Sequence, residues 1–105
     1  MTLQEIYKGL EGLGYPIAYR AFAEGEVPDP PYIVYYEQGT DNFSADGIPY
    51  DIITDLDIEL YTKTKDPEAE QKIIDWLTEN GMYWEKEEYY IESTELLQVI
   101  FETEH

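Results

Sequence analysis

Three acidic residues at alternating positions are the most suggestive chemical feature of the chain. Asp55, Asp57 and Glu59 fall within a stretch that is rich in β-branched and aliphatic residues. On a β-strand, alternate side chains share one face and lie about 6.5–7 Å apart. Carboxylate oxygens are the ligands that hard cations prefer, so a metal-dependent hydrolase is one interpretation. A row on one strand diverges, however, whereas metal ligands converge, and we therefore favour a solvated or partner-facing acidic strand face.

A second acidic segment has weaker metal-binding character. Asp41 and Asn42 precede Asp46 and Gly47, a spacing that faintly resembles a calcium-binding loop. The segment lacks the alternating ligands and the terminal glutamate of such loops. An Asp-Gly pair is more simply a turn. The glycines of the chain also match neither a phosphate-binding loop nor a dinucleotide fingerprint. We therefore expect no metal and no cofactor.

Nucleophilic catalysis has few candidate residues in this sequence. The chain has no cysteine, and its one histidine is His105, the last residue. Terminal residues are usually mobile, so we expect His105 to be a loose tail or the remnant of a tag. The commonest nucleophile and general-base side chains are thus missing, and the sequence predicts a protein that is not an enzyme.

Two amphipathic helices are expected. The first spans residues 2–13, because Thr2 and Glu5 have capping-box spacing and Gly14 ends the pattern. The second spans residues 67–80, with Asp66 as N-cap, Pro67 at the first helical position and Gly81 beyond the end. Apolar residues recur at helical spacing in both segments: Leu3, Ile6, Leu10 and Leu13 in the first, Ala69, Ile73, Ile74 and Leu77 in the second.

Five strands complete the expected fold. The clearest covers residues 52–62, where Leu56, Ile58 and Leu60 alternate with the acidic row. Others are expected at residues 17–24, 32–37, 82–91 and 95–104, with a short hairpin connection between the last two. Residues 38–50 are expected to form a long excursion between strands, because they are rich in Gly, Asp and Pro. The order α-β-β-β-α-β-β predicts a two-layer α+β domain over residues 1–105, with a mainly antiparallel sheet and both helices on one face.

The composition is that of one folded domain, and the net charge is its most unusual property. The chain has 105 residues, of which 43% are hydrophobic and 15% aromatic. Its net charge is −18, which repels phosphate backbones and anionic lipids. No leader and no membrane-spanning segment are expected from the sequence. The charge leaves three interpretations: a solvated surface, a surface for a basic partner, or a surface past which DNA slides without sticking.

Aromatic residues are more numerous than a small core requires. The chain has eleven Tyr, three Phe and two Trp. We expect most to be core or sheet-face residues, and some to anchor an interface. An exposed strand edge is a further route to self-association. The aromatic residues considered for these roles are Trp76, Trp84, Tyr35, Tyr89 and Tyr90.

Several segments together resemble a known family. They are similar, in order and spacing over nearly the whole chain, to small prophage tail-completion proteins of Gram-positive bacteria, which belong with the phage tail terminator or tail-to-head joining proteins. None of these segments is catalytic. The segments are Pro30-Pro31-Tyr32-Ile33-Val34-Tyr35, Asn42-Phe43-Ser44-Ala45-Asp46 with Tyr50, Ile58-Glu59-Leu60-Tyr61-Thr62, Lys65-Asp66 and Tyr90-Ile91-Glu92-Ser93.

The resemblance implies a structural protein of the virion tail that assembles in the host cytoplasm. Its copies would form a ring, a homohexamer, that caps the finished tail tube and meets the head connector, without sequence-specific nucleic-acid binding or membrane contact. A chain that is monomeric until it meets the tube is compatible with this. The resemblance places residues 38–50 toward the lumen or the ring interface. Candidate lumen or interface residues are Asp41, Asn42, Phe43, Asp46, Tyr50, Asp55, Asp57 and Glu59.

Two alternatives belong to other functional classes. An acidic DNA mimic would use carboxylates spaced like phosphates to block a DNA-binding protein, and would act as a monomer or dimer. A metal-dependent hydrolase would need a divalent ion at the acidic row of residues 55, 57 and 59. The sequence favours the tail terminator over the mimic, and the mimic over the hydrolase, because a site and not a fold must justify an enzyme.

Overall fold

Two helices and five strands make up the chain in the computed structural model. It describes residues 1–45 and 48–105, and within residues 41–45 and 48–52 it describes only the backbone. In chain order the elements are α1 (Leu3–Glu11), β1 (Ile17–Tyr19), β2 (Tyr32–Ala45), β3 (Ile48–Thr62), α2 (Pro67–Glu79), β4 (Trp84–Ile91) and β5 (Leu96–Glu104).

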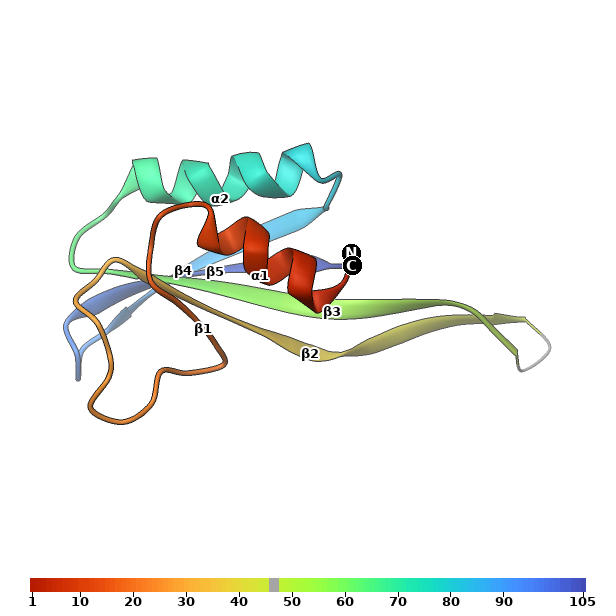
Figure 1. Cartoon of the computed structure of the whole chain (residues 1–105), viewed down its shortest axis with the longest axis horizontal. Coiled ribbons are helices and arrows are strands. Elements are labelled where there is room, and N and C mark those ends of the chain that lie inside the picture. The colour runs from red at the N-terminus through yellow and green to blue at the C-terminus, as the bar shows by residue number, and fades with distance from the viewer. Residues whose placement is uncertain (46–47) are drawn as a thin grey trace.

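The five strands form one sheet in the order β1-β2-β3-β5-β4. The short β1 runs parallel to β2, and every other pair is antiparallel. Both helices cover the same face of the sheet, and the other face has no helix over it (Figure 1). The expected element order and the two-layer α+β design with a mainly antiparallel sheet are confirmed.

Local signals set the helix ends as the sequence predicts. The Thr2 side chain accepts a hydrogen bond from the Glu5 amide at 3.1 Å, and the Thr2 amide donates one to the Glu5 carboxylate at 2.9 Å. α1 ends at Glu11, two residues before the expected end, and Gly14 then turns the chain at a φ of 95°. In α2, the Asp66 side chain caps the Ala69 amide and Gly81 follows at a φ of 67°.

The core lies between the helices and the inner face of the sheet. The two helices approach each other closely at Gly9, where an added Cβ would lie 2.2 Å from the Trp76 indole nitrogen. Trp76 is therefore a core residue that packs where only glycine leaves room. No helix in the described part of the chain is long and apolar enough to cross a membrane. The innermost apolar residues are Ile6, Leu10, Ile33, Leu56, Ile58, Leu60, Ile73, Leu77, Val99 and Phe101.

The expected excursion over residues 38–50 is wrong, because most of it is strand. β2 continues to Ala45 and β3 begins at Ile48, so the two form a long antiparallel ribbon. Backbone pairing between the strands overrides the turn-forming residues, and the pairing shifts between Glu37 and Gly39 and again between Phe43 and Ser44. The ribbon projects beyond the helices along the 49 Å axis of the molecule (Figure 1).

The strand expected at residues 17–24 is much shorter. β1 stops at Tyr19, and Arg20 adopts a φ of 70°, a left-handed conformation that breaks an extended strand. The chain then loops out on the helix-free side before β2 begins (Figure 1). β1 therefore covers only the first few residues of β2, and within residues 1–45 and 48–105 no strand lies beside the rest of that β2 edge.

Candidate functional site: the helix-free face of the sheet

The helix-free face of the sheet concentrates acidic side chains. Strand register places them in rows across three strands, for example Asp57 of β3 beside Glu102 of β5, which lies beside Glu85 of β4. Asp55 and Glu104 form the next row. We call this surface the acidic face, and its carboxylates are those of Asp55, Asp57, Glu59, Glu85, Glu87, Glu102 and Glu104.

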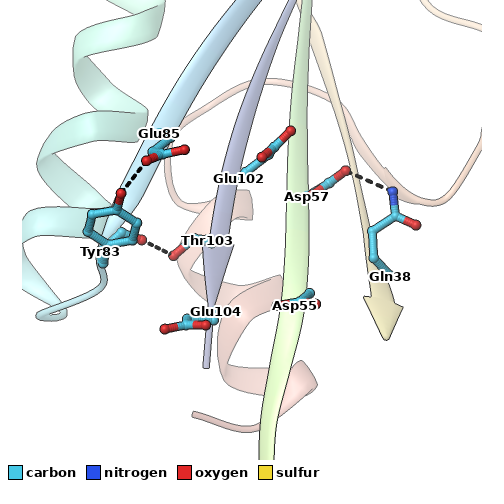
Figure 2. Close-up of a pocket in the computed structure, with 8 residues that line it drawn as sticks. All are labelled: Gln38, Asp55, Asp57, Tyr83, Glu85, Glu102, Thr103 and Glu104. Atoms are coloured by element: carbon cyan, nitrogen blue, oxygen red, sulfur yellow. Dashed lines mark hydrogen bonds between the residues drawn. The ribbon is translucent and has the colours of Figure 1, made fainter. Parts of the chain in front are cut away.

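A shallow hollow of about 410 Å³ lies on the acidic face at its ribbon end (Figure 2). The Tyr83 hydroxyl donates to the Glu85 carboxylate, and the Thr103 hydroxyl donates to the Tyr83 carbonyl. Gln38 Nε2 donates to Asp57 Oδ2 at 3.0 Å. Every charged residue that lines the hollow is acidic: Asp55, Asp57, Glu85, Glu102 and Glu104.

Like charges repel one another within this face. The negative charge of Glu87 raises the pKa of Glu102, with smaller contributions from burial, Asp57 and Glu85. A raised carboxyl pKa means that ionisation is disfavoured by like charges. The acidic face therefore favours an approaching cation and disfavours an approaching phosphate.

Glu59 is not a solvated member of this face, which corrects the expected wet strand face. Glu59 is only 7% exposed, although neither α1 nor α2 covers this face. The hydroxyls of Tyr36 and Tyr61 both donate to its carboxylate, the second at 2.6 Å, and Gln98 Nε2 donates at 3.2 Å. Burial, and then the bond to Glu59, raises the pKa of both tyrosines. Glu59 is thus an internal acceptor that ties β2, β3 and β5 together.

The other expected site residues divide between described and undescribed side chains. Asp57 is 9% exposed and accepts a hydrogen bond from Gln38, so it is also less exposed to solvent than expected. Asp55 is half-buried and lines the hollow. Asp46 lies outside the described residues. For the remaining residues the structure gives a strand backbone in the ribbon and nothing of the side chain; they are Asp41, Asn42, Phe43 and Tyr50.

The acidic row does not form a metal-binding group. Within residues 1–45 and 48–105, no three His, Cys, Asp or Glu side chains come together in a way that could hold a metal ion. Asp55, Asp57 and Glu59 follow one strand, and the Glu59 carboxylate is occupied by two hydroxyls and an amide. The hydrolase interpretation therefore lacks a geometric basis in the described residues.

The expected mobile tail at His105 is also wrong. The His105 backbone exchanges two 2.9 Å hydrogen bonds with Thr54, which extends the pairing of β3 and β5 by one position. Its ring Nδ1 lies 2.7 Å from the Met1 carbonyl, and its Nε2 lies 3.5 Å from a Glu37 carboxylate oxygen. The imidazole therefore joins both ends of the chain to the base of the ribbon.

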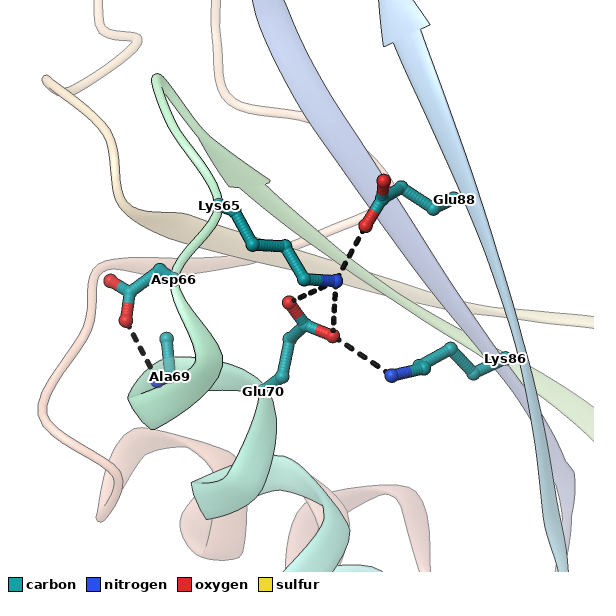
Figure 3. Close-up of polar contacts among 6 residues, drawn as sticks. All are labelled: Lys65, Asp66, Ala69, Glu70, Lys86 and Glu88. Atoms are coloured by element: carbon teal, nitrogen blue, oxygen red, sulfur yellow. Dashed lines mark hydrogen bonds and ion pairs between the residues drawn. The ribbon is translucent and has the colours of Figure 1, made fainter.

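An ion-pair network around one buried carboxylate on the helix side was not foreseen from the sequence. Glu70 of α2 is 3% exposed and contacts Lys65 at 2.9 Å and Lys86 at 3.0 Å (Figure 3). Lys65 also bonds Glu88 of β4 at 2.6 Å. Burial alone would raise the pKa of Glu70, but the hydrogen bonds from the two lysines outweigh it, so the pKa lies below its usual value. The network fastens the start of α2 to the outermost strand.

The Glu70 network predicts a pH-dependent contribution to stability. Because the folded-state pKa of Glu70 is lowered, its stabilisation is present above the unfolded value near 4.5 and is lost as pH falls through the folded value. Glu70→Gln should destabilise the fold by about 1 kcal/mol at pH 7. Chemical denaturation should show that the difference in unfolding free energy between the native chain and this variant becomes smaller from pH 7 to pH 3. Glu88→Gln, at the exposed end of the network, is the control and should have little effect; an undiminished difference for Glu70→Gln at pH 3 would contradict the assignment.

Comparison with known proteins adds no relative: no protein-family model, curated protein or solved structure matches this chain.

Proposed function

We propose that this chain is a structural assembly protein of the phage tail terminator type. Its copies form a ring, a hexamer by the resemblance set out above, that caps the tail tube and meets the head connector protein. The proposal places it in the virion tail, after assembly in the host cytoplasm. It assigns the chain no chemical step and no cofactor. The acidic face, left uncovered by either helix, is the observation that carries the proposal.

An acidic surface suits a passage for DNA. Carboxylates offer a sliding phosphate backbone no attractive contact, so DNA does not stall against them. The proposal orients the exposed carboxylates of β5, Glu102 and Glu104, toward the lumen. Glu59 has a different role, because its hydrogen bonds hold the face rigid from within.

The projecting ribbon also supports an assembly role. The radius of gyration is 14.9 Å, against about 13 Å for a compact domain of this length. A two-stranded ribbon outside the core is marginally stable by itself and exposes backbone groups along its edges. A neighbouring copy or the tube end would cover it.

The direct test is molar mass by light scattering after size exclusion, at high protein concentration in low and in high salt. We expect a species of about six times the 12.3 kDa chain mass, favoured by salt. Subunits of charge −18 repel one another, and salt screens that repulsion beyond about 8 Å at physiological strength. A strict monomer at every salt concentration would contradict self-assembly by this chain.

An acidic DNA mimic is the second candidate. The observation that favours it is the regular array of carboxylates in register across β3, β5 and β4. Such a protein would remain a monomer or dimer and bind a basic DNA-binding protein tightly, whereas the ring would bind a tube end. Competition with duplex DNA for a nuclease or a repressor distinguishes the two: a mimic displaces the DNA, and a terminator leaves it bound.

A further inference from the structure

Arg20 is the one arginine of a chain that has 24 acidic residues. Even so, it forms no ion pair within the part of the chain that the structure describes. Its guanidinium lies 5.0 Å from the ring centroid of Tyr36 and 6.0 Å from that of Tyr19, and it donates to the Glu37 carbonyl at 3.3 Å. The aromatic rings therefore hold the guanidinium in place, and no carboxylate among the described side chains pairs with it.

The surroundings of Arg20 have the composition of an interaction hot spot. It lines a hollow of about 200 Å³ whose other walls include Phe22, Val27 and Tyr32. Val27, which lines the hollow, is 57% exposed, and Tyr19, whose ring lies beside Arg20, is 43% exposed. Arginine and tyrosine are the residues most enriched where binding energy concentrates. We call Tyr19, Arg20, Phe22 and Val27 the Arg20 patch.

A surface with acidic and aromatic side chains lies at the opposite edge of the same sheet. β1, which leads into Arg20, is one terminal strand, and β4 is the other. β4 carries Glu85 and Glu87 on the acidic face, and each accepts a hydrogen bond from a tyrosine, Tyr83 and Tyr89 respectively. These tyrosines are 64% and 48% exposed. We call Tyr83, Glu85, Glu87 and Tyr89 the β4 strip.

We propose that the Arg20 patch of one copy binds the β4 strip of the next, with Arg20 pairing with the carboxylates of the strip. The inference rests on the proposed function and names the contact that would build its ring. One surface is cationic and aromatic, the other acidic and aromatic, so the two complement each other in charge and in apolar character. Because the patches lie at opposite edges of the sheet, the contact is head-to-tail, and such contacts close into rings or extend into filaments.

Charge reversal tests this pairing directly. Arg20→Glu and Glu87→Arg should each raise the concentration for half-assembly by about tenfold or more, measured by light scattering at one fixed salt concentration. The doubly reversed chain, R20E/E87R, should regain assembly. An equimolar mixture of the two single variants should also assemble, because every junction between unlike copies then joins opposite charges.

Two controls match these changes in charge at exposed helix positions outside both surfaces. Lys8→Glu matches Arg20→Glu, and Glu79→Arg matches Glu87→Arg. Thermal melting establishes that each variant is folded, and rescue in R20E/E87R excludes a folding defect as the cause of lost assembly. If the controls lose assembly as strongly as the single variants, net charge and not this contact is responsible, and the proposal is overturned.

The experiment separates this contact from the ring function. If the native protein and both single variants form the same ring, the contact is wrong and the ring function stands. If the charge reversals abolish and restore a dimer or an open filament, the contact is right and the ring function is wrong. A native protein that is monomeric at the highest attainable concentration overturns the contact, and a ring would then form only on the tube end.

Discussion

Gly9→Ala is expected to destabilise the fold by about 2 kcal/mol, although alanine is the better helix former. The new Cβ would lie 2.2, 2.6 and 2.8 Å from three atoms of the Trp76 indole, distances that no packed carbon tolerates. Overpacking of this kind costs about 1–3 kcal/mol, and here we expect the upper end. The gain in helix propensity, about 1 kcal/mol, offsets only part of it. Thermal melting should show a midpoint about 10 °C lower.

Gly12→Ala is the matched control for this prediction. Gly12 caps the same helix with a right-handed backbone, and its added Cβ would lie no closer than 3.4 Å to a backbone oxygen. We expect a change within about 0.5 kcal/mol. A cycle with Trp76→Phe completes the test, since removal of the larger ring should relieve much of the Gly9→Ala penalty. Equal penalties in the two backgrounds would place the clash elsewhere.

Glu59→Gln should destabilise the fold by about 2 kcal/mol despite removing one of many negative charges. Two hydroxyls and one amide donate to the carboxylate, and a neutral amide in its place accepts fewer of these bonds and adds donors of its own. The tyrosines should also respond: without the Glu59 charge, the pKa of Tyr36 and of Tyr61 should fall toward the ordinary value of about 10. Denaturant melting and an alkaline absorbance titration measure the two effects.

Glu102→Gln removes an equal charge from the adjacent strand on the same face. Like charges raise the pKa of Glu102, led by Glu87, so its ionised form is under repulsion and not held by donors. We therefore expect this variant to be neutral or slightly stabilised. If Glu59→Gln behaved in the same way, the network around Glu59 would be without energetic importance, and the acidic face would be governed by net charge alone.

The helices were the most predictable part of the fold, because their signals are local. Capping residues such as Thr2 and Asp66 accept hydrogen bonds from amides three positions further along the chain. The spacing of apolar residues within one helix indicates which of its sides is buried. The alternation of Leu56, Ile58 and Leu60 was equally informative, since a strand with one buried face shows it in its own sequence.

The ribbon was less predictable because its stability comes from the other strand. Residues 38–50 contain turn-forming residues, and their own preferences favour a loop. Antiparallel pairing along β2 and β3 supplies the backbone hydrogen bonds that a loop would lack, and shifts in the pairing accommodate the awkward positions. Such long-range compensation leaves no mark in a short window of sequence.

The hydrogen-bond networks of Glu59 and Glu70 were likewise not predictable from the sequence. The alternation around Glu59 predicts a wet strand face, and no local signal marks Glu70 as buried, yet both are buried. Their donors come from segments far along the chain, including Gln98 for Glu59 and Lys86 for Glu70. A buried acid with distant donors becomes recognisable only when the topology is known.

The place of β5 within the sheet has a consequence for biosynthesis. β5 follows β4 in the chain and lies between β3 and β4, so β4 has no strand to pair with until residues 96–104 have been synthesised. The sheet is therefore completed from the middle and not extended edge by edge. A prematurely terminated chain would lack a central strand, expose the underside of both helices and be a substrate for proteolysis. The strand order would thus keep chains that lack residues 96–104 from any later assembly.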